Sequence, residues 1–126
     1  MALFKTLITG LGLALMSLSV SAHHSTNGIY NEEVEVELTG TVKQWRFINP
    51  HPSLLLDVVG PDGKIQEWDI SYGGSAVAHL TRRGYKVDTF ETGDRIKVKG
   101  FAAKVSTAYG LLIQGNPTHE DGTEIP

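Results

Sequence analysis

Apolar and polar residues alternate from position 34 onward, the pattern of a β-strand with one face turned to a core. Between Val34 and Val42 the even positions are apolar or glycine, and the odd positions are glutamate or threonine. After Val42 the phase changes, because Trp45 and Phe47 stand where polar residues stood before. We expect a β-bulge that re-aims both rings inward, or a strand that crosses to a second layer. Gly40 predicts a bend within the same strand.

Four further segments have apolar alternation or a short apolar run, and they predict strands over residues 53–59, 65–71, 93–104 and 109–114. Between the third and fourth strands the pattern changes to that of a short helix over residues 76–83. Ser75 is a typical N-cap residue for this helix. Gly84 is suited to the position just after its end.

The predicted order of elements, β-β-β-α-β-β, is the order of the OB-fold, a five-stranded partly open barrel. We therefore expect an all-β fold with one short helix, a small five-stranded OB-like barrel over residues 34–117. The alternative is a small β-sandwich with an incidental helix. We expect residues 23–33 to form an extended N-terminal arm and residues 118–126 to form a flexible tail.

The first 22 residues have the composition of a secretory signal peptide. Lys5 supplies the positive start, residues 7–18 are largely apolar, and Val20-Ser21-Ala22 offers small or tolerated residues for cleavage. The apolar run is too short for an ordinary membrane span. We therefore expect export to the periplasm and no stable membrane insertion after cleavage, with an uncleaved anchor as the alternative. Removing 22 of the 126 residues leaves 104, which suits one small domain.

Composition excludes several classes of function. The chain has no cysteine, so it has no disulfide, thiolate ligand or cysteine nucleophile. It carries 14 acidic and 11 basic residues, a balance that argues against nucleic-acid binding through a basic face. Glu67 and Asp69 share a strand face and could pair as acid and base, but a solvated strand face is the simpler interpretation. We therefore predict no catalytic residues and no enzymatic activity.

Residues 49–52, Asn-Pro-His-Pro, predict a stiff corner between the first two strands. Each proline fixes its own φ angle and restricts the residue before it. His51 is therefore expected to lie on an unusually constrained backbone.

Six short motifs are spread over nearly the whole chain after the signal peptide: Ala22-His23-His24-Ser25, Thr39-Gly40-Thr41-Val42, Asn49-Pro50-His51, Gly73-Gly74-Ser75, Arg82-Arg83-Gly84 and Gly93-Asp94. In this combination the chain resembles an uncharacterised family of small exported bacterial proteins. The resemblance implies export and a single β domain, and it implies no reaction.

Cleavage after Ala22 would make His23 the N-terminal residue. Its α-amine and ring Nδ1 could then chelate copper, and a distant histidine would complete the T-shaped site called a histidine brace. Such nitrogen ligands suit Cu(II), and His51 is the candidate third ligand, with His24 in reserve. Cleavage after Ser21 would instead make His24 the third residue of the mature chain. The α-amine, two backbone amides and the ring of His24 would then bind Cu(II) in a square plane.

The leading hypothesis is therefore an exported Cu(II)-binding protein for storage, delivery or sensing, with copper as its one cofactor. The alternative is a metal-free module that holds a small ligand, glycan or peptide on the barrel face near Trp45, Phe47 and Tyr72. The simplest interpretation of the same residues is a solvated histidine tail and two core aromatics. We expect His79 and His119 not to be ligands, and the protein to be a monomer or weak dimer.

Overall fold

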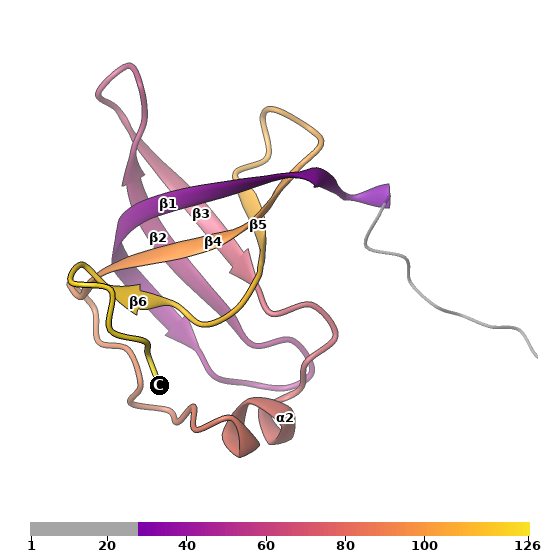
Figure 1. The fold of residues 1–126 in the computed structure, drawn as a ribbon, viewed down its shortest axis with the longest axis vertical. Coiled ribbons are helices and arrows are strands. Elements are labelled where there is room, and N and C mark those ends of the chain that lie inside the picture. Colours follow the sequence, from indigo (N-terminus) through magenta and orange to yellow (C-terminus); the bar gives the residue numbers. More distant parts are fainter. Residues whose placement is uncertain (1–27) are drawn as a thin grey trace, which may run out of the picture.

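The computed structural model describes residues 28–126, which form six strands and one short helix (Figure 1). The elements are β1 (Tyr30–Arg46), β2 (Ser53–Val59), β3 (Ile65–Ser71), α2 (Val77–Arg82), β4 (Arg95–Ala103), β5 (Gly110–Ile113) and β6 (Thr118–His119). The prediction of an all-β fold with one short helix is confirmed. Among these residues no helix has the length and apolar character needed to cross a membrane.

The strands close into a barrel because β1 is long enough to pair with two neighbours. Its first part runs antiparallel to β4, up to the pair Thr41 and Arg95, and its last part runs antiparallel to β2 from the pair Thr41 and Asp57. β3 then pairs with β2 on one side and, in parallel, with β5 on the other, and β5 pairs with β4. This closed order, with the helix between β3 and β4, is the topology of an OB-fold.

Two features let β1 bend around the barrel. Gly40 is buried where β1 passes from β4 to β2, and a Cβ there would lie 2.9 Å from the carbonyl oxygen of Asp57. Glycine is therefore required by this close backbone approach. The register shifts between Val42 and Gln44, which confirms the predicted β-bulge. After the bulge Trp45 packs against the core.

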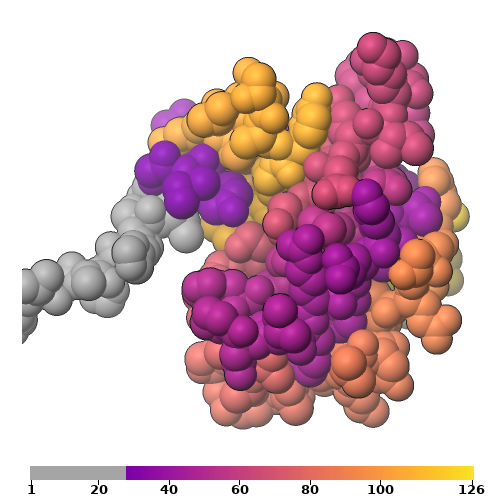
Figure 2. All heavy atoms as spheres, turned by 180° about the vertical axis from the view of Figure 1, so that it is seen from behind, coloured from indigo at the N-terminus to yellow at the C-terminus, as the bar shows by residue number. Residues whose placement is uncertain are grey.

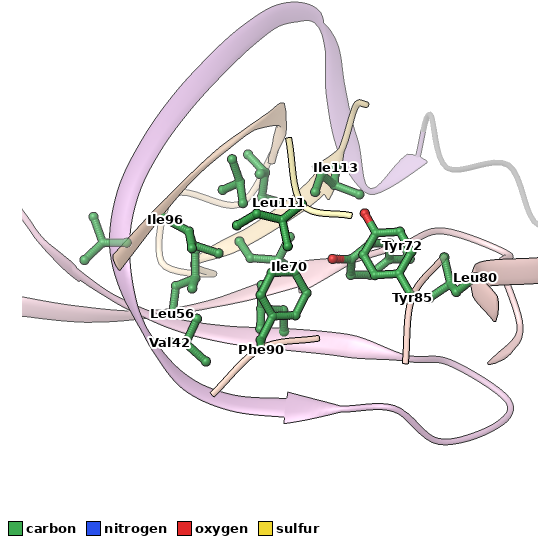
Figure 3. Packing of buried hydrophobic residues seen from close by; sticks show 14 residues of the cluster. Val42, Leu56, Ile70, Tyr72, Leu80, Tyr85, Phe90, Ile96, Leu111 and Ile113 are labelled. Atoms are coloured by element: carbon green, nitrogen blue, oxygen red, sulfur yellow. The ribbon is translucent and has the colours of Figure 1, made fainter. Parts of the chain in front are cut away.

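The core fills the barrel with the inward-facing side chains of the strands, as Figure 3 shows. The predicted inward row of β2, Leu54, Leu56 and Val58, is buried. No polar or charged side chain other than tyrosine is buried among the described residues. Apolar burial is therefore the main term that stabilises the fold.

Helix α2 is shorter than predicted and begins with a different cap. Ala76, and not Ser75, is the N-cap residue, and it contributes no side-chain cap. The N–H of Val77 donates instead to Oδ1 of Asn49 at 3.0 Å, and the N–H of Ala76 donates to Nδ1 of His79 at 3.3 Å. The start of α2 is thus tied to the corner, residues 49–52.

The C-terminal residues do not form the predicted flexible tail over 118–126. β6 pairs with the first part of β4, where His119 lies opposite Ile96. Ile125 is 7% exposed and belongs to the core, and its N–H donates to the carbonyl of Pro117 at 2.8 Å. The prediction was wrong because one buried isoleucine near the end anchors an otherwise polar segment.

The N-terminal boundary also differs from the prediction. β1 begins at Tyr30, so the last residues of the expected arm over 23–33 belong to the barrel. The predicted signal peptide and the two histidines His23 and His24 lie outside the described residues.

Candidate functional site

A pocket of about 430 Å³ lies on the outer side of β2 and β3, beside the corner. We call it the corner pocket. Ligands of OB-folds commonly bind on this face, between the β1–β2 and β4–β5 loops. Its lining residues are Tyr30, Arg46, His51, Pro52, Ser53, Asp69, Ser71 and Gly110.

The pairing of β1, β2 and β3 brings the polar residues of the corner pocket close together. Arg46 at the end of β1 lies opposite Ser53 on β2, and Ser53 lies opposite Ser71 on β3. Residues directly opposite in antiparallel strands share a face, and Asp69 shares it too because it precedes Ser71 by two positions. The sequence alone does not indicate this set of residues, since only the pairing of distant strands brings its members together.

Two ion pairs cross the same outer face. Arg46 and Asp69 approach to 3.7 Å between Nη1 and Oδ2, and Lys43 pairs with Glu67. The hydrogen bond and the negative charge of Glu67 raise the pKa of Lys43. Glu67 and Asp69 therefore each face a cation, which is the arrangement of a solvated strand face and not of an acid–base pair.

His51 lies exposed at the rim of the corner pocket. The β1–β2 loop, residues 47–52, is anchored on both sides of it. Phe47 stacks on Trp45 with ring centroids 5.3 Å apart, and Pro52 is buried. Among the described residues, no group hydrogen-bonds or ion-pairs with the imidazole of His51. Both of its nitrogens are therefore open to a ligand or metal within this part of the chain.

The predicted ligand face of Trp45, Phe47 and Tyr72 does come together, but its rings contact other rings of the protein. Trp45 lies 5.6 Å from Tyr72 and 5.1 Å from Phe90, centroid to centroid. Its Nε1 donates to the carbonyl of Lys86 at 2.8 Å. None of the three lines the corner pocket. Their contacts are those of core aromatics that fasten the segment after α2 to the barrel.

Two buried tyrosines of this cluster differ in hydrogen bonding. Both hydroxyls lie within the barrel in Figure 3. The hydroxyl of Tyr85 donates to Oδ1 of Asn116 at 3.2 Å, whereas the hydroxyl of Tyr72, a residue 5% exposed, has no partner among the described residues. Burial raises the pKa of Tyr85, and it raises the pKa of Tyr72 well above its ordinary value.

Metal ligands are sparse in the described part of the chain. Residues 28–126 contain no group of three or more histidine, aspartate or glutamate side chains placed to hold a metal ion. His79 accepts a backbone hydrogen bond at α2, and His119 is exposed in β6. Of the predicted ligands, only His51 is described, and His23 and His24 lie outside this range.

Tyr30 connects the corner pocket with the undescribed N-terminal residues. It is the first residue of β1 and lines the same pocket as His51. It also lines a neighbouring hollow of about 620 Å³ between the start of β1 and the end of β4. In Figure 2 the indigo start of β1 lies on the same side of the molecule as the corner. The chain before Tyr30 therefore joins the barrel at the edge of the corner pocket.

Comparison with known proteins gives a family but no activity. A model described as a family of unknown function, DUF6152, matches residues 12–113, which is most of the chain. This agrees with the expected membership of an uncharacterised family. No curated protein matches the chain.

Proposed function

This chain belongs to the DUF6152 family, and because that family has no assigned function, we propose one from the site: the exported protein binds Cu(II) at the corner pocket through His23 and His51. The ion would be held for storage, delivery or sensing in the periplasm. His24 is the reserve ligand if the signal peptide is cleaved one residue earlier.

The observation that carries the proposal is that Tyr30 and His51 line the same pocket. Six residues separate His23 from Tyr30. An extended chain covers about 3.3 Å per residue, so the seven steps between them span up to about 23 Å. That reach exceeds the width of a pocket of about 430 Å³. The arm is therefore long enough for His23 to reach His51 in the proposed site.

The donor set suits copper. A free N-terminal histidine offers an amine and a ring nitrogen, and the unpartnered imidazole of His51 offers a third nitrogen. Cu(II) prefers nitrogen ligands in a tetragonal arrangement. The carboxylate of Asp69 lines the same pocket, but its nearest charged partner is Arg46, so we do not assign it as a ligand.

The test is a Cu(II) titration of protein that begins at His23, followed by native mass spectrometry and electron paramagnetic resonance. We expect one tightly held ion per chain with nitrogen hyperfine structure. His51→Ala should weaken binding by about tenfold or more, a typical effect of disturbing a metal site. An extra residue ahead of His23 should instead move the copper to the square-planar site of His24, so that binding no longer depends on His51. His119→Ala, an exposed histidine outside the corner pocket, is the matched control and should bind as the unmodified protein does.

Two results would contradict this proposal. One is a protein that begins at His23 and holds no copper at micromolar concentration. The other is equal affinity in His51→Ala, which would confine the site to the arm. A natural terminus at Ala22 with copper retained in His51→Ala would assign the metal to His24 instead.

A second candidate is a metal-free site for a small polar ligand in the same pocket. The observation that favours it is the row Arg46, Ser53 and Ser71, which presents a guanidinium and two hydroxyls on the usual ligand face of an OB-fold. Monosaccharides and dipeptides can be screened by shifts of the Ser53 and Ser71 amide resonances. Binding by this route should be lost in Arg46→Ala and should not depend on the residue ahead of His23.

A further inference from the structure

We infer that Asn49 is a positioning residue for His51: its side chain fastens the corner to α2 and thereby sets the copper affinity of the corner pocket. The first part of this inference stands on the structure of residues 28–126. The second part rests on the proposed function.

The contact itself joins two distant parts of the chain. Oδ1 of Asn49 accepts a hydrogen bond from the N–H of Val77 at 3.0 Å, across 28 residues of sequence. Val77 is the first residue of α2, whose leading N–H groups have no partner within the helix. Among the described residues, this is the only hydrogen bond between the β1–β2 loop and another element. Asn49 therefore both caps the helix and holds the loop.

The rest of the loop shows why this bond matters for His51. Phe47 and Pro52 fix the two ends, by stacking on Trp45 and by burial. The four residues between them, including Ile48 at 62% exposure, are all exposed. Asn49 is thus the hydrogen-bonded anchor of an otherwise exposed stretch that carries the proposed ligand.

A ligand that is already held in place binds a metal more tightly than one that must first be ordered. Loss of the Asn49 bond should leave His51 chemically intact but less well placed. Changes outside the direct ligands of metal sites typically weaken affinity by about 10–100-fold. For a contact that acts through two residues of backbone we expect the lower end, about tenfold.

The helix start provides its own matched control. His79 caps the same end of α2 from within the helix, by accepting the N–H of Ala76 at 3.3 Å. His79→Ala therefore removes a cap of the same helix without releasing the loop. Asn49→Asp keeps an oxygen acceptor at the position and should act as a rescue variant beside Asn49→Ala.

The experiment compares the unmodified protein with these three variants, each beginning at His23. The amide ¹⁵N order parameter of His51 reports the mobility of the corner without metal, and a competition titration reports Cu(II) affinity. We expect Asn49→Ala to lower the order parameter and to weaken Cu(II) binding about tenfold. Asn49→Asp and His79→Ala should match the unmodified protein in both measurements.

The outcomes separate this inference from the proposed function. An unchanged order parameter in Asn49→Ala overturns the positioning role, whatever the protein does with copper. A lowered order parameter with unchanged copper affinity overturns the link between the anchor and the metal. If the unmodified protein binds no copper, the proposed function fails. If in the same experiment the order parameter of His51 falls in Asn49→Ala and in neither of the other two variants, the positioning role is supported. An equally lowered order parameter of His51 in His79→Ala would show that the mobility of the corner depends on helix capping in general, and it would also overturn the inference.

Discussion

Gly100 lies so close to Leu112 that a Cβ on Gly100 would come within 2.1 Å of the Leu112 carbonyl oxygen. The two residues belong to β4 and β5, whose pairing helps to close the barrel. The obstacle is backbone and not the end of a flexible side chain, so it cannot move aside without opening the strand pair. Closure of the barrel therefore depends on glycine at this position.

We expect Gly100→Ala to lower the free energy of unfolding by about 3 kcal/mol or more, since overpacking against rigid surroundings is costly. Urea denaturation followed by tryptophan fluorescence would measure the change. Gly74→Ala is the matched control, because a Cβ at Gly74 meets no atom within 4 Å. A Gly100→Ala protein as stable as the control would show that β4 and β5 can separate at little cost.

Removal of the Tyr72 hydroxyl should not harm the fold. The Tyr72 hydroxyl makes no hydrogen bond of ordinary distance but interacts with the neighbouring Tyr85, so Tyr72→Phe should change the free energy of unfolding by less than about 1 kcal/mol. Tyr85→Phe should lower it by about 1 kcal/mol, because it removes the hydrogen bond to Asn116. Thermal unfolding of the two variants tests the contrast. Equal effects of the two substitutions would contradict the difference in bonding.

The same tyrosines predict instability at high pH. Burial raises the pKa of Tyr72 and Tyr85 in the folded state, whereas an unfolded tyrosine titrates near pH 10. Above about pH 10 the unfolded chain loses these protons first, so the contribution of the two tyrosines to stability should be constant below that pH and fall as the pH rises further. Each tyrosine can contribute up to about 1.4 kcal/mol per pH unit. Urea titrations from pH 8 to 11 should show a smaller decline in Tyr72→Phe, and an identical decline would refute the assignment.

Ile125 should matter more than its place near the C-terminus suggests. Ile125→Ala removes a core side chain and should cost about 2 kcal/mol, the lower end of the range for such truncations. Val87→Ala, at a position 76% exposed, is the control and should change stability little. Differential scanning calorimetry would compare them. Equal melting temperatures would restore the prediction of a loose tail.

The sequence predicted the barrel well because the barrel is built from local patterns. Alternation with period two marked the strands, and the phase change after Val42 marked the bulge that turns Trp45 toward the core. The glycine at position 40 marked the bend. The order of elements then left the OB-fold as the expected topology, which the closed strand order confirms.

The site was less predictable because its parts are joined across the chain. His51 could be singled out from two flanking prolines, but Arg46 and Ser71 join it only through the pairing of three strands. The cap of α2 was assigned to Ser75 from local preference, whereas the structure uses Asn49, 28 residues away from Val77. Contacts of this kind have no local sequence signal. The roles of the N-terminal histidines stay predictions.

The length of the arm offers a test that no single ligand substitution provides. If copper joins His23 to His51, the chain between the two ligands forms a loop, and lengthening a loop weakens its closure slowly. Inserting six glycine and serine residues after position 27 roughly doubles the arm, which should cost about 0.6 kcal/mol, or about threefold in Cu(II) affinity. In a His51→Ala background the same insertion should have no further effect, since no loop is closed there. A site made by the arm alone would be indifferent to the insertion in both backgrounds, and competition titration would detect the difference.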